Sequence, residues 1–256
     1  MTKIVLIGSG NVATNLAFAL KDKCAIAQIY SRKLAHAREL AEQVGCEHYT
    51  DALGDVVADA QVYILAVNDD AIADIAASLP DNNALWIHTS GSKPLDLLKT
   101  HGKRAVMWPM QSLSKSSPKP LEGSYIGVEA NTATALSQVK RRAKMLTANV
   151  VEADGEKRLQ MHMASVFACN FSNHMYTLAA EILKGIDLDF EVLLPLVRNT
   201  VDKLSSLSPL ESQTGPAARG DHEVIDTHRK MLDGDKKEIY ELLSRSIEQR
   251  QRDKDK

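Results

Sequence analysis

The stretch that most constrains the fold is residues 3–20, where a short apolar run meets a glycine turn and then a helical pattern. Residues 4–7 are all apolar, most of them are β-branched, and they lead directly into Gly8. Beyond Ala13 the apolar residues Leu16, Ala17 and Leu20 fall on one side of a helix. This order predicts a strand, a tight turn and a helix.

The small residues of the turn have the spacing Gly8-x-Gly10-x-x-Ala13, the alanine-ended form of the dinucleotide-binding fingerprint. Gly8 permits the sharp turn, Gly10 lets a pyrophosphate approach the backbone, and Ala13 lets the helix pack closely on the strand. The free N–H groups at the helix start then face the phosphates. A purely structural turn is the alternative. The predicted cofactor contacts in this turn are Gly8, Ser9, Gly10, Asn11, Val12 and Ala13.

The composition is that of an ordinary globular chain. Its 256 residues, 44% of them apolar, suffice for one large domain or two modest ones. A formal net charge of -2 gives no electrostatic reason to expect nucleic acid or an anionic membrane as partner. No apolar run approaches the roughly 20 residues of a membrane span, and a strand that begins at Lys3 leaves no room for a signal peptide. We therefore expect a cytoplasmic protein.

The cysteines Cys24, Cys46 and Cys169 are widely spaced and form no CxxC pair. An odd number without such a pair argues against a disulfide or zinc framework. The histidines and acidic residues between positions 222 and 228 match no established ligand spacing. We expect reduced thiols in or near the core and no metal site.

The residues after the second predicted strand, 25–30, indicate which cofactor binds. A cofactor without a 2′-phosphate usually meets an acidic residue about 20 residues beyond the fingerprint. This chain has Ser31, Arg32 and Lys33 there instead. Cations and a hydroxyl suit a 2′-phosphate, so the sequence predicts NADP(H). Ser31 is also predicted to cap the helix over residues 33–44. The alternative for Arg32 and Lys33 is that they are simply solvated residues of the first turn of this helix.

Further strands are predicted at residues 62–67, 85–88 and 105–108, each followed by a polar segment. The carboxyl ends of parallel strands bind ligands in open α/β sheets. Val67, Asn68 and Ser90 are therefore predicted cofactor contacts, although Asn68 could equally be a helix cap. Gln111, after the third of these strands, is a candidate substrate contact. A Ser-, Lys- and Pro-rich loop at 112–124 follows.

The alternation of strands and helices ends near residue 153, and the remainder is helical in period. We predict an α/β Rossmann dinucleotide-binding domain at residues 1–153 and an all-α domain at 154–256. Helices are expected over residues 156–184, 190–207, 222–232 and 236–251, with a loop before residue 221.

Five motifs carry a family resemblance: residues 8–13 (GSGNVA), 88–92 (HTSGS), 108–112 (WPMQS), 161–170 (MHMASVFACN) and 214–221 (TGPAARGD). With them the chain resembles the superfamily of pyrroline-5-carboxylate reductase, ketopantoate reductase and β-hydroxyacid dehydrogenases. More narrowly it is similar to bacterial NADP oxidoreductases of the coenzyme-F420-dependent type, whose helical half is a domain of unknown function. The resemblance implies an active site between the domains and a homodimer formed through the helical domains.

The proton donor is the least constrained part of the site. β-Hydroxyacid dehydrogenases use a lysine on the first helix of the second domain, but the comparable place here holds His162. Imidazole suits proton transfer near neutrality. We predict His162 as acid/base, with Ser165 and Asn170 as hydrogen-bonding partners. His162 and His174 could equally be structural histidines between helices.

Two further groups are candidate substrate contacts. His174 lies one turn beyond Asn170. Thr214 and Arg219 lie in the loop before residue 221, where an arginine fork could hold a carboxylate. Arg219 could instead pair with Asp221 or act at a dimer interface.

The sequence thus predicts an NADP-dependent oxidoreductase that transfers a hydride to or from a small carbonyl or imine, with no nucleic-acid or membrane partner. The alternatives are a deazaflavin-dependent NADP reductase and a non-catalytic NADP-binding sensor.

Overall fold

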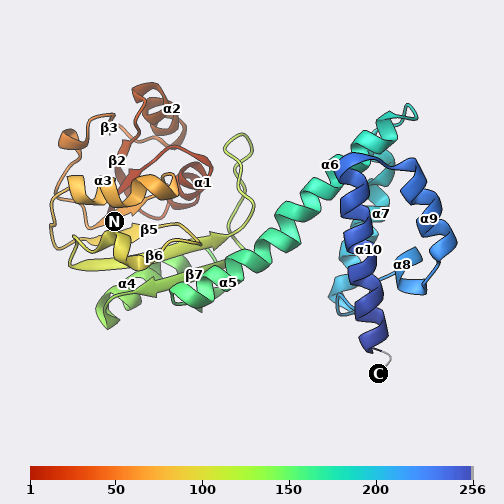
Figure 1. The fold of residues 1–256 in the computed structure, drawn as a ribbon. Helices are drawn as coiled ribbons and strands as arrows, with labels where there is room; N and C mark the ends of the chain where they lie inside the picture. The colour runs from red at the N-terminus through yellow and green to blue at the C-terminus, as the bar shows by residue number, and fades with distance from the viewer. Residues whose placement is uncertain (255–256) are drawn as a thin grey trace. The chain divides into compact units, whose positions relative to one another are not determined.

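The computed structural model describes residues 1–254. The chain divides into two compact units, Met1–Asn170 and Phe171–Lys256. The first contains all the strands and the second is helical (Figure 1). This is the expected α/β domain followed by a helical one.

The first unit is built on one eight-stranded sheet of order β3-β2-β1-β4-β5-β6-β7-β8. Its strands run parallel except at β6 and β7, which pair antiparallel. The strands are β1 (Lys3–Ile7), β2 (Ala25–Tyr30), β3 (Tyr49–Thr50), β4 (Val62–Leu65), β5 (Leu85–His88), β6 (Lys103–Met110), β7 (Tyr125–Ala130) and β8 (Val150–Glu152).

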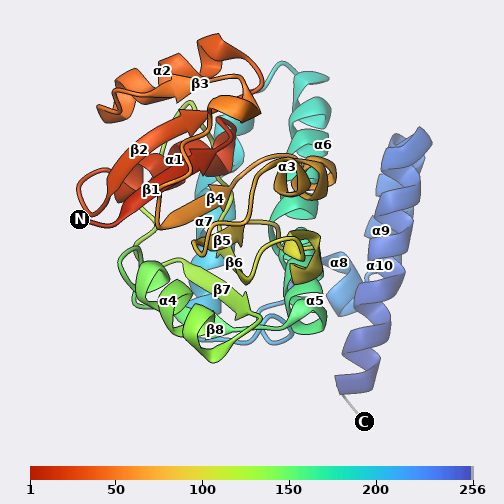
Figure 2. The ribbon, with the colours of Figure 1, turned by 90° about the vertical axis from the view of Figure 1, so that its left-hand side faces the viewer.

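Helices cover both faces of this sheet (Figure 2). Because side chains alternate along a strand, Ile4 and Leu6 of β1 enter one buried cluster and Val5 and Ile7 the other. The first cluster contains residues of α1, α2 and α4, and the second contains residues of α3. The helices are α1 (Asn11–Leu20), α2 (Leu34–Val44), α3 (Ile72–Ser78), α4 (Ala133–Lys144) and α5 (Gly155–Ser165), with short 3₁₀ segments η1 (Leu53–Asp55), η2 (Asp69–Ala71) and η3 (Leu95–Leu98).

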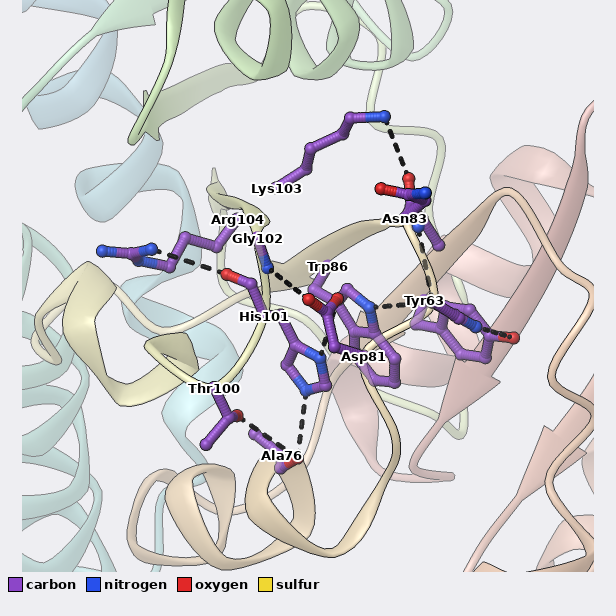
Figure 3. A network of polar contacts seen from close by, with 12 residues as sticks. Tyr63, Ala76, Asp81, Asn83, Trp86, Thr100, His101, Gly102, Lys103 and Arg104 are labelled. Carbon is purple, nitrogen blue, oxygen red and sulfur yellow. Dashed lines mark hydrogen bonds and ion pairs between the residues drawn. The ribbon is translucent and has the colours of Figure 1, made fainter.

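An aromatic stack fills part of the second cluster (Figure 3). The Trp86 ring lies between the rings of Tyr63 and His101, with centroid distances of 4.2 Å and 3.7 Å. Trp86 Nε1 donates to the side-chain oxygen of Asn82, and His101 Nε2 lies 3.0 Å from the carbonyl oxygen of Ala76. The stack therefore combines apolar burial with paired polar edges.

The second unit consists of α6 (Ser172–Lys184), η5 (Phe190–Leu193), α7 (Leu194–Asp202), η6 (Lys203–Ser205), α8 (Pro216–Arg219), α9 (His222–Met231) and α10 (Gly234–Lys254). Within residues 1–254, no helix combines the length and the apolar character that crossing a membrane requires.

Four local expectations were wrong. Ser31 does not cap α2, whose N-cap is Lys33 without a side-chain bond, because the Ser31 hydroxyl pairs with Ser9 instead. Cys169 is exposed, unlike Cys24 and Cys46. The predicted loop before residue 221 contains the short helix α8, which starts at a proline. The strand predicted at 105–108 runs from Lys103 to Met110, and Pro109 lies opposite Ile126 of the antiparallel strand β7.

The long helix predicted over residues 156–184 is interrupted by a π-helical segment, η4 (Val166–Phe171), between α5 and α6. A π segment inserts extra residues per turn and rotates the faces of the helix beyond it. Offsets of three and four along the chain therefore no longer place residues before and after this segment on one face of the helix. The boundary between the two units also falls at this segment, so that the contacts of α5 place it in the same unit as the sheet. The last strand of the sheet ends earlier, at Glu152.

Candidate functional site

A cavity of about 950 Å³ lies at the carboxyl ends of the central strands of the first unit. The fingerprint turn, the end of β2, the end of β4 and one distant lysine line it. Its polar and charged wall comes from residues 8–12, 31–33 and 66–68 together with His36 and Lys115. This is the place where α/β sheets bind dinucleotides.

The glycines of the turn meet two different geometric demands. Gly8 has φ +124°, and a Cβ there would lie 2.1 Å from the carbonyl oxygen of Ala66. Gly10 caps α1, and a Cβ there would meet nothing within 4 Å. Gly8 thus lets the turn pack on β4, while Gly10 leaves the free N–H groups of the first turn of α1 open toward the cavity. Ala13 is fully buried in the core, as the close helix packing requires.

The cavity wall beyond β2 is basic. Ser31 Oγ lies 2.7 Å from Ser9 Oγ, which joins the end of β2 to the fingerprint turn. Arg32 and Lys33 are exposed and line the cavity, and within residues 1–254 neither side chain forms an ion pair or a hydrogen bond. No carboxylate is among the described lining residues. A nucleotide carrying a 2′-phosphate fits this donor set, because two unpaired cations and a hydroxyl can bind it and no acid opposes it.

The wall beyond β4 leads to a second polar cluster. Val67 and Asn68 line the cavity, and Asn68 makes no side-chain capping bond to η2. Next to it, Asp69 Oδ2 accepts hydrogen bonds of 2.8 Å from the hydroxyls of both Ser90 and Ser92. Ser90 itself is buried in this network and is not among the cavity-lining residues. Asp69 thereby ties the cavity edge to the loop after β5.

That loop packs on the predicted acid/base residue. Gly91 lies so close to the rings of Trp108 and His162 that a Cβ on it would approach their atoms to 2.5 Å and 2.8 Å. The centroids of these two rings are 5.8 Å apart. His162 is partly exposed. A side chain at position 91 would therefore force one of these two rings to move.

Arg158 anchors α5 one turn before His162. The side chain is 1% exposed, pairs with Glu129 of β7 and donates to the carbonyl oxygen of Lys93 at 2.6 Å. A buried guanidinium needs such partners to offset its desolvation. Arg158 therefore fixes α5 against both the sheet and the loop after β5.

The remaining predicted residues of the first unit lie near this cluster in the chain. Ser165 Oγ donates to the Met161 carbonyl oxygen at 2.9 Å, one turn back along α5. Asn170 is exposed in the π segment. Gln111 follows β6, and its buried Oε1 has no hydrogen-bond partner among the described residues. A buried acceptor of this kind can take a hydrogen bond from a ligand.

The other three predicted substrate contacts belong to the second unit. His174 lies exposed on α6, Thr214 is exposed before α8, and Arg219 is exposed at the end of α8. Asp221 caps α9 through its side chain, and it forms no ion pair with Arg219 in the described part of the chain. No group of three or more potential metal-ligating side chains occurs in the same residues.

His88, at the end of β5, is the most strongly perturbed titratable group. It is completely buried, and its Nδ1 accepts a hydrogen bond from the Ser90 backbone N–H. Burial, together with the nearby positive charge of Arg158, lowers its pKa from 6.5 to about 4. His88 is therefore neutral at pH 7 and acts as an acceptor that holds the loop.

Sequence reasoning did not single out Trp108, Asp69, Arg158 or Lys115 as site residues. Asp69 was within reach, because it adjoins Asn68 at the same strand end. Trp108 ends an apolar strand and resembled core. Arg158 and Lys115 gave no local signal, since their partners lie tens of residues away.

Two family models match the chain. Residues 3–88 match NADP oxidoreductase, coenzyme F420-dependent, and residues 124–247 match a domain of unknown function, DUF2520. None of the curated proteins compared with this chain matches it.

Solved structures are similar over nearly the whole chain. A provisionally named NADP oxidoreductase from Bacteroides fragilis is 42% identical at a TM-score of 0.91, over 97% of this chain and 98% of that one. A protein from Thermotoga maritima is 25% identical at a TM-score of 0.75, over 99% and 100%. A reductive aminase from Aspergillus terreus, solved with NADPH and ethyl-5-oxohexanoate, shares the fold at a TM-score of 0.70 and 15% identity, over 99% and 94%. The chain therefore belongs to the family of NADP oxidoreductases in which a coenzyme-F420-dependent-type domain precedes a DUF2520 domain, and NADP is its cofactor.

Proposed function

We propose that the protein transfers a hydride between NADP(H) and a small carbonyl or imine compound that carries a carboxylate, with His162 as the acid/base. The observation that carries this proposal is a chain of contacts within the first unit. Asn68 lines the nucleotide cavity, and its neighbour Asp69 binds the two serines that flank Gly91. Gly91 in turn packs on His162. The cofactor site and the candidate proton donor are thereby joined through one loop.

NADP(H), when bound, supplies or accepts the hydride. The protein must then bind the reacting group and move one proton. His162 is the candidate for that proton, with Ser165 and Asn170 as its proposed hydrogen-bonding partners. The unpartnered Oε1 of Gln111 is suited to accept a hydrogen bond from a substrate hydroxyl or amine. His174, Thr214 and Arg219 are the proposed substrate contacts of the helical unit, with Arg219 holding the carboxylate.

We also propose that the protein is a homodimer formed through the helical unit. Among the described residues of that unit only Ala217, Ile225 and Ser244 are buried. Large apolar side chains such as Leu196 and Val201 are 61% and 56% exposed. Apolar surface of this extent is typical of subunit interfaces.

The first test is a calorimetric titration of the purified protein with NADPH and, in parallel, with NADH. Micromolar binding of NADPH and much weaker binding of NADH are expected. Keto acids and imines are then screened for oxidation of the bound NADPH. If the folded protein bound neither nucleotide, the proposed hydride transfer would be contradicted at its first requirement, cofactor binding.

The second test is a His162→Gln variant, assayed with any substrate found in the screen. Loss of a general acid typically lowers turnover about 10²–10⁴-fold, while NADPH affinity should stay unchanged. His48→Gln, which alters an exposed histidine of the same unit, is the matched control. Equal turnover in the two variants would exclude His162 as the acid/base.

A second candidate function is transfer of a hydride between NADP and a reduced deazaflavin. The description of the matched N-terminal family favours it. Incubation of the protein with NADP and a reduced deazaflavin distinguishes the two: rapid deazaflavin oxidation, without any accepted keto acid or imine, would favour this reaction. A protein that binds NADPH and passes neither assay would instead fit a sensor.

A further inference from the structure

The loop between β6 and β7 brings a lysine to the nucleotide cavity from far along the chain. Lys115 lines the cavity together with the fingerprint turn, although it lies 104 positions beyond Asn11. Its side chain is exposed and has neither an ion pair nor a hydrogen bond within residues 1–254. A free cation at this place needs a reason, because the neighbouring wall is already basic.

Two asparagines of α1 hold the loop in place. Asn11 Oδ1 accepts a hydrogen bond of 3.0 Å from the backbone N–H of Lys115. Asn15 is 1% exposed and uses both ends of its amide: Nδ2 donates to the Ser114 carbonyl oxygen at 3.0 Å, and Oδ1 accepts from the Lys119 N–H at 2.9 Å. The backbone of Lys115 is therefore bonded directly to the first turn of α1.

The loop is also anchored by its apolar residues. Leu121 is 1% exposed within the first buried cluster, and Leu113 packs against the same cluster. Lys115 thus lies on a segment held at both ends by buried apolar side chains and in the middle by hydrogen bonds to Asn11 and Asn15. Such a segment presents a side chain at a defined place, as a binding residue requires.

We propose that Lys115 binds the pyrophosphate of the dinucleotide, opposite the N-terminus of α1. This inference rests on the proposed use of the cavity by NADP(H). The pyrophosphate is the expected partner, rather than the 2′-phosphate, because the Lys115 backbone is bonded to Asn11 in the turn that faces the pyrophosphate. The 2′-phosphate is instead expected at Arg32 and Lys33, which line the cavity at the end of β2. Lys115 therefore contributes to the affinity for both nicotinamide dinucleotides and leaves the preference between them unchanged.

The test compares Lys115→Met with Lys119→Met by calorimetric titration with NADPH and NADH. Lys119 lies on the same loop and its backbone N–H donates to Asn15 of the same helix, but it does not line the nucleotide cavity. Lys115→Met should raise the dissociation constants of both nucleotides roughly tenfold, the usual effect of losing one charge-assisted hydrogen bond. Lys119→Met should change neither dissociation constant. Arg32→Ala should weaken NADPH alone.

A double-mutant cycle tests whether Asn15, which holds the loop on α1, affects nucleotide binding through Lys115. Asn15→Ala should weaken both nucleotides, and adding it to Lys115→Met should cause little further loss if Asn15 acts through the lysine. Thermal melting of each variant checks that it is folded; should Asn15→Ala fail to fold, the Lys115 and Lys119 variants still decide the matter, because both residues are exposed.

Three outcomes would overturn the inference: unchanged binding in Lys115→Met, equal effects of Lys115→Met and Lys119→Met, or loss of NADPH binding alone. Failure of the proposed function is distinguishable, since it is seen in the unaltered protein, either as no nucleotide binding or as no turnover.

Discussion

The two units of this chain bury their apolar residues to very different degrees. In the first unit, two clusters on opposite faces of the sheet contain side chains that are almost completely buried, such as Leu16 and Trp86 at 0% and 1% exposed. In the second unit, the helices expose apolar side chains such as Leu196, at 61%. A small set of helices with so few buried residues leaves part of each apolar face uncovered. The sheet unit therefore carries its own core, whereas the helical unit leaves apolar surface uncovered, which the proposed dimer would bury.

The largest expected effect comes from removing the stacked indole of Trp86, which tests the core of the sheet unit. Trp86→Ala should lower the free energy of unfolding of the first unit by about 4 kcal/mol, because it leaves a cavity between Tyr63 and His101 (Figure 3). The measurement is urea unfolding followed by fluorescence. The chain has two tryptophans, both in the first unit, so Trp108 still reports on that unit in the variant.

Leu34→Ala is the control for this measurement, because Leu34 is apolar but 46% exposed on α2. Its cost should stay within about 0.5 kcal/mol. A Trp86→Ala cost as small as that of the control would mean that the stack does not stabilise the sheet unit.

The second effect is acid destabilisation of the sheet unit through His88. The unfolded histidine binds a proton near pH 6.5, and the folded one only near pH 4. The unfolded state thus holds more protons between these values, so that stability is complete above pH 6.5 and falls by about 3 kcal/mol as the pH drops to 4. Urea unfolding across this pH range measures the loss.

His88→Gln should remove most of this loss, leaving the part due to His101, whose pKa burial also lowers. His48→Gln, at an exposed position, should leave the loss unchanged. An acid profile that is the same in His88→Gln and the unaltered protein would show that another group is responsible.

The first unit was also the more predictable of the two from the sequence. Strand and turn signals are local, so the fingerprint glycines, the basic residues after β2 and the order of strands and helices followed from residues close together in the chain. The Ser31 hydroxyl was misassigned as a cap because its partner, Ser9, follows the neighbouring strand β1 and lies 22 positions away in the chain.

The candidate proton site was less predictable because it combines distant segments. The contacts among Gly91, Trp108 and His162 join three regions of the chain. The same is true of Arg158 with Glu129, and of Lys115 with Asn11. In the helical half, the π segment η4 rotated a face that simple α-helical spacing had defined.

The smallest expected effect tests the helical unit itself. Leu196→Ala should weaken self-association, because the side chain is exposed in the single chain and is proposed to be buried in the dimer. Loss of a buried leucine side chain at an interface corresponds to at least about 1.4 kcal/mol, or roughly a tenfold higher dissociation constant. Sedimentation equilibrium of the unaltered protein and the variant measures this change in the dissociation constant.

Leu34→Ala, which removes a similarly exposed leucine from the sheet unit, should leave the association unchanged. A protein that is monomeric at micromolar concentration, or one in which both variants weaken association equally, would break the contrast between the two units.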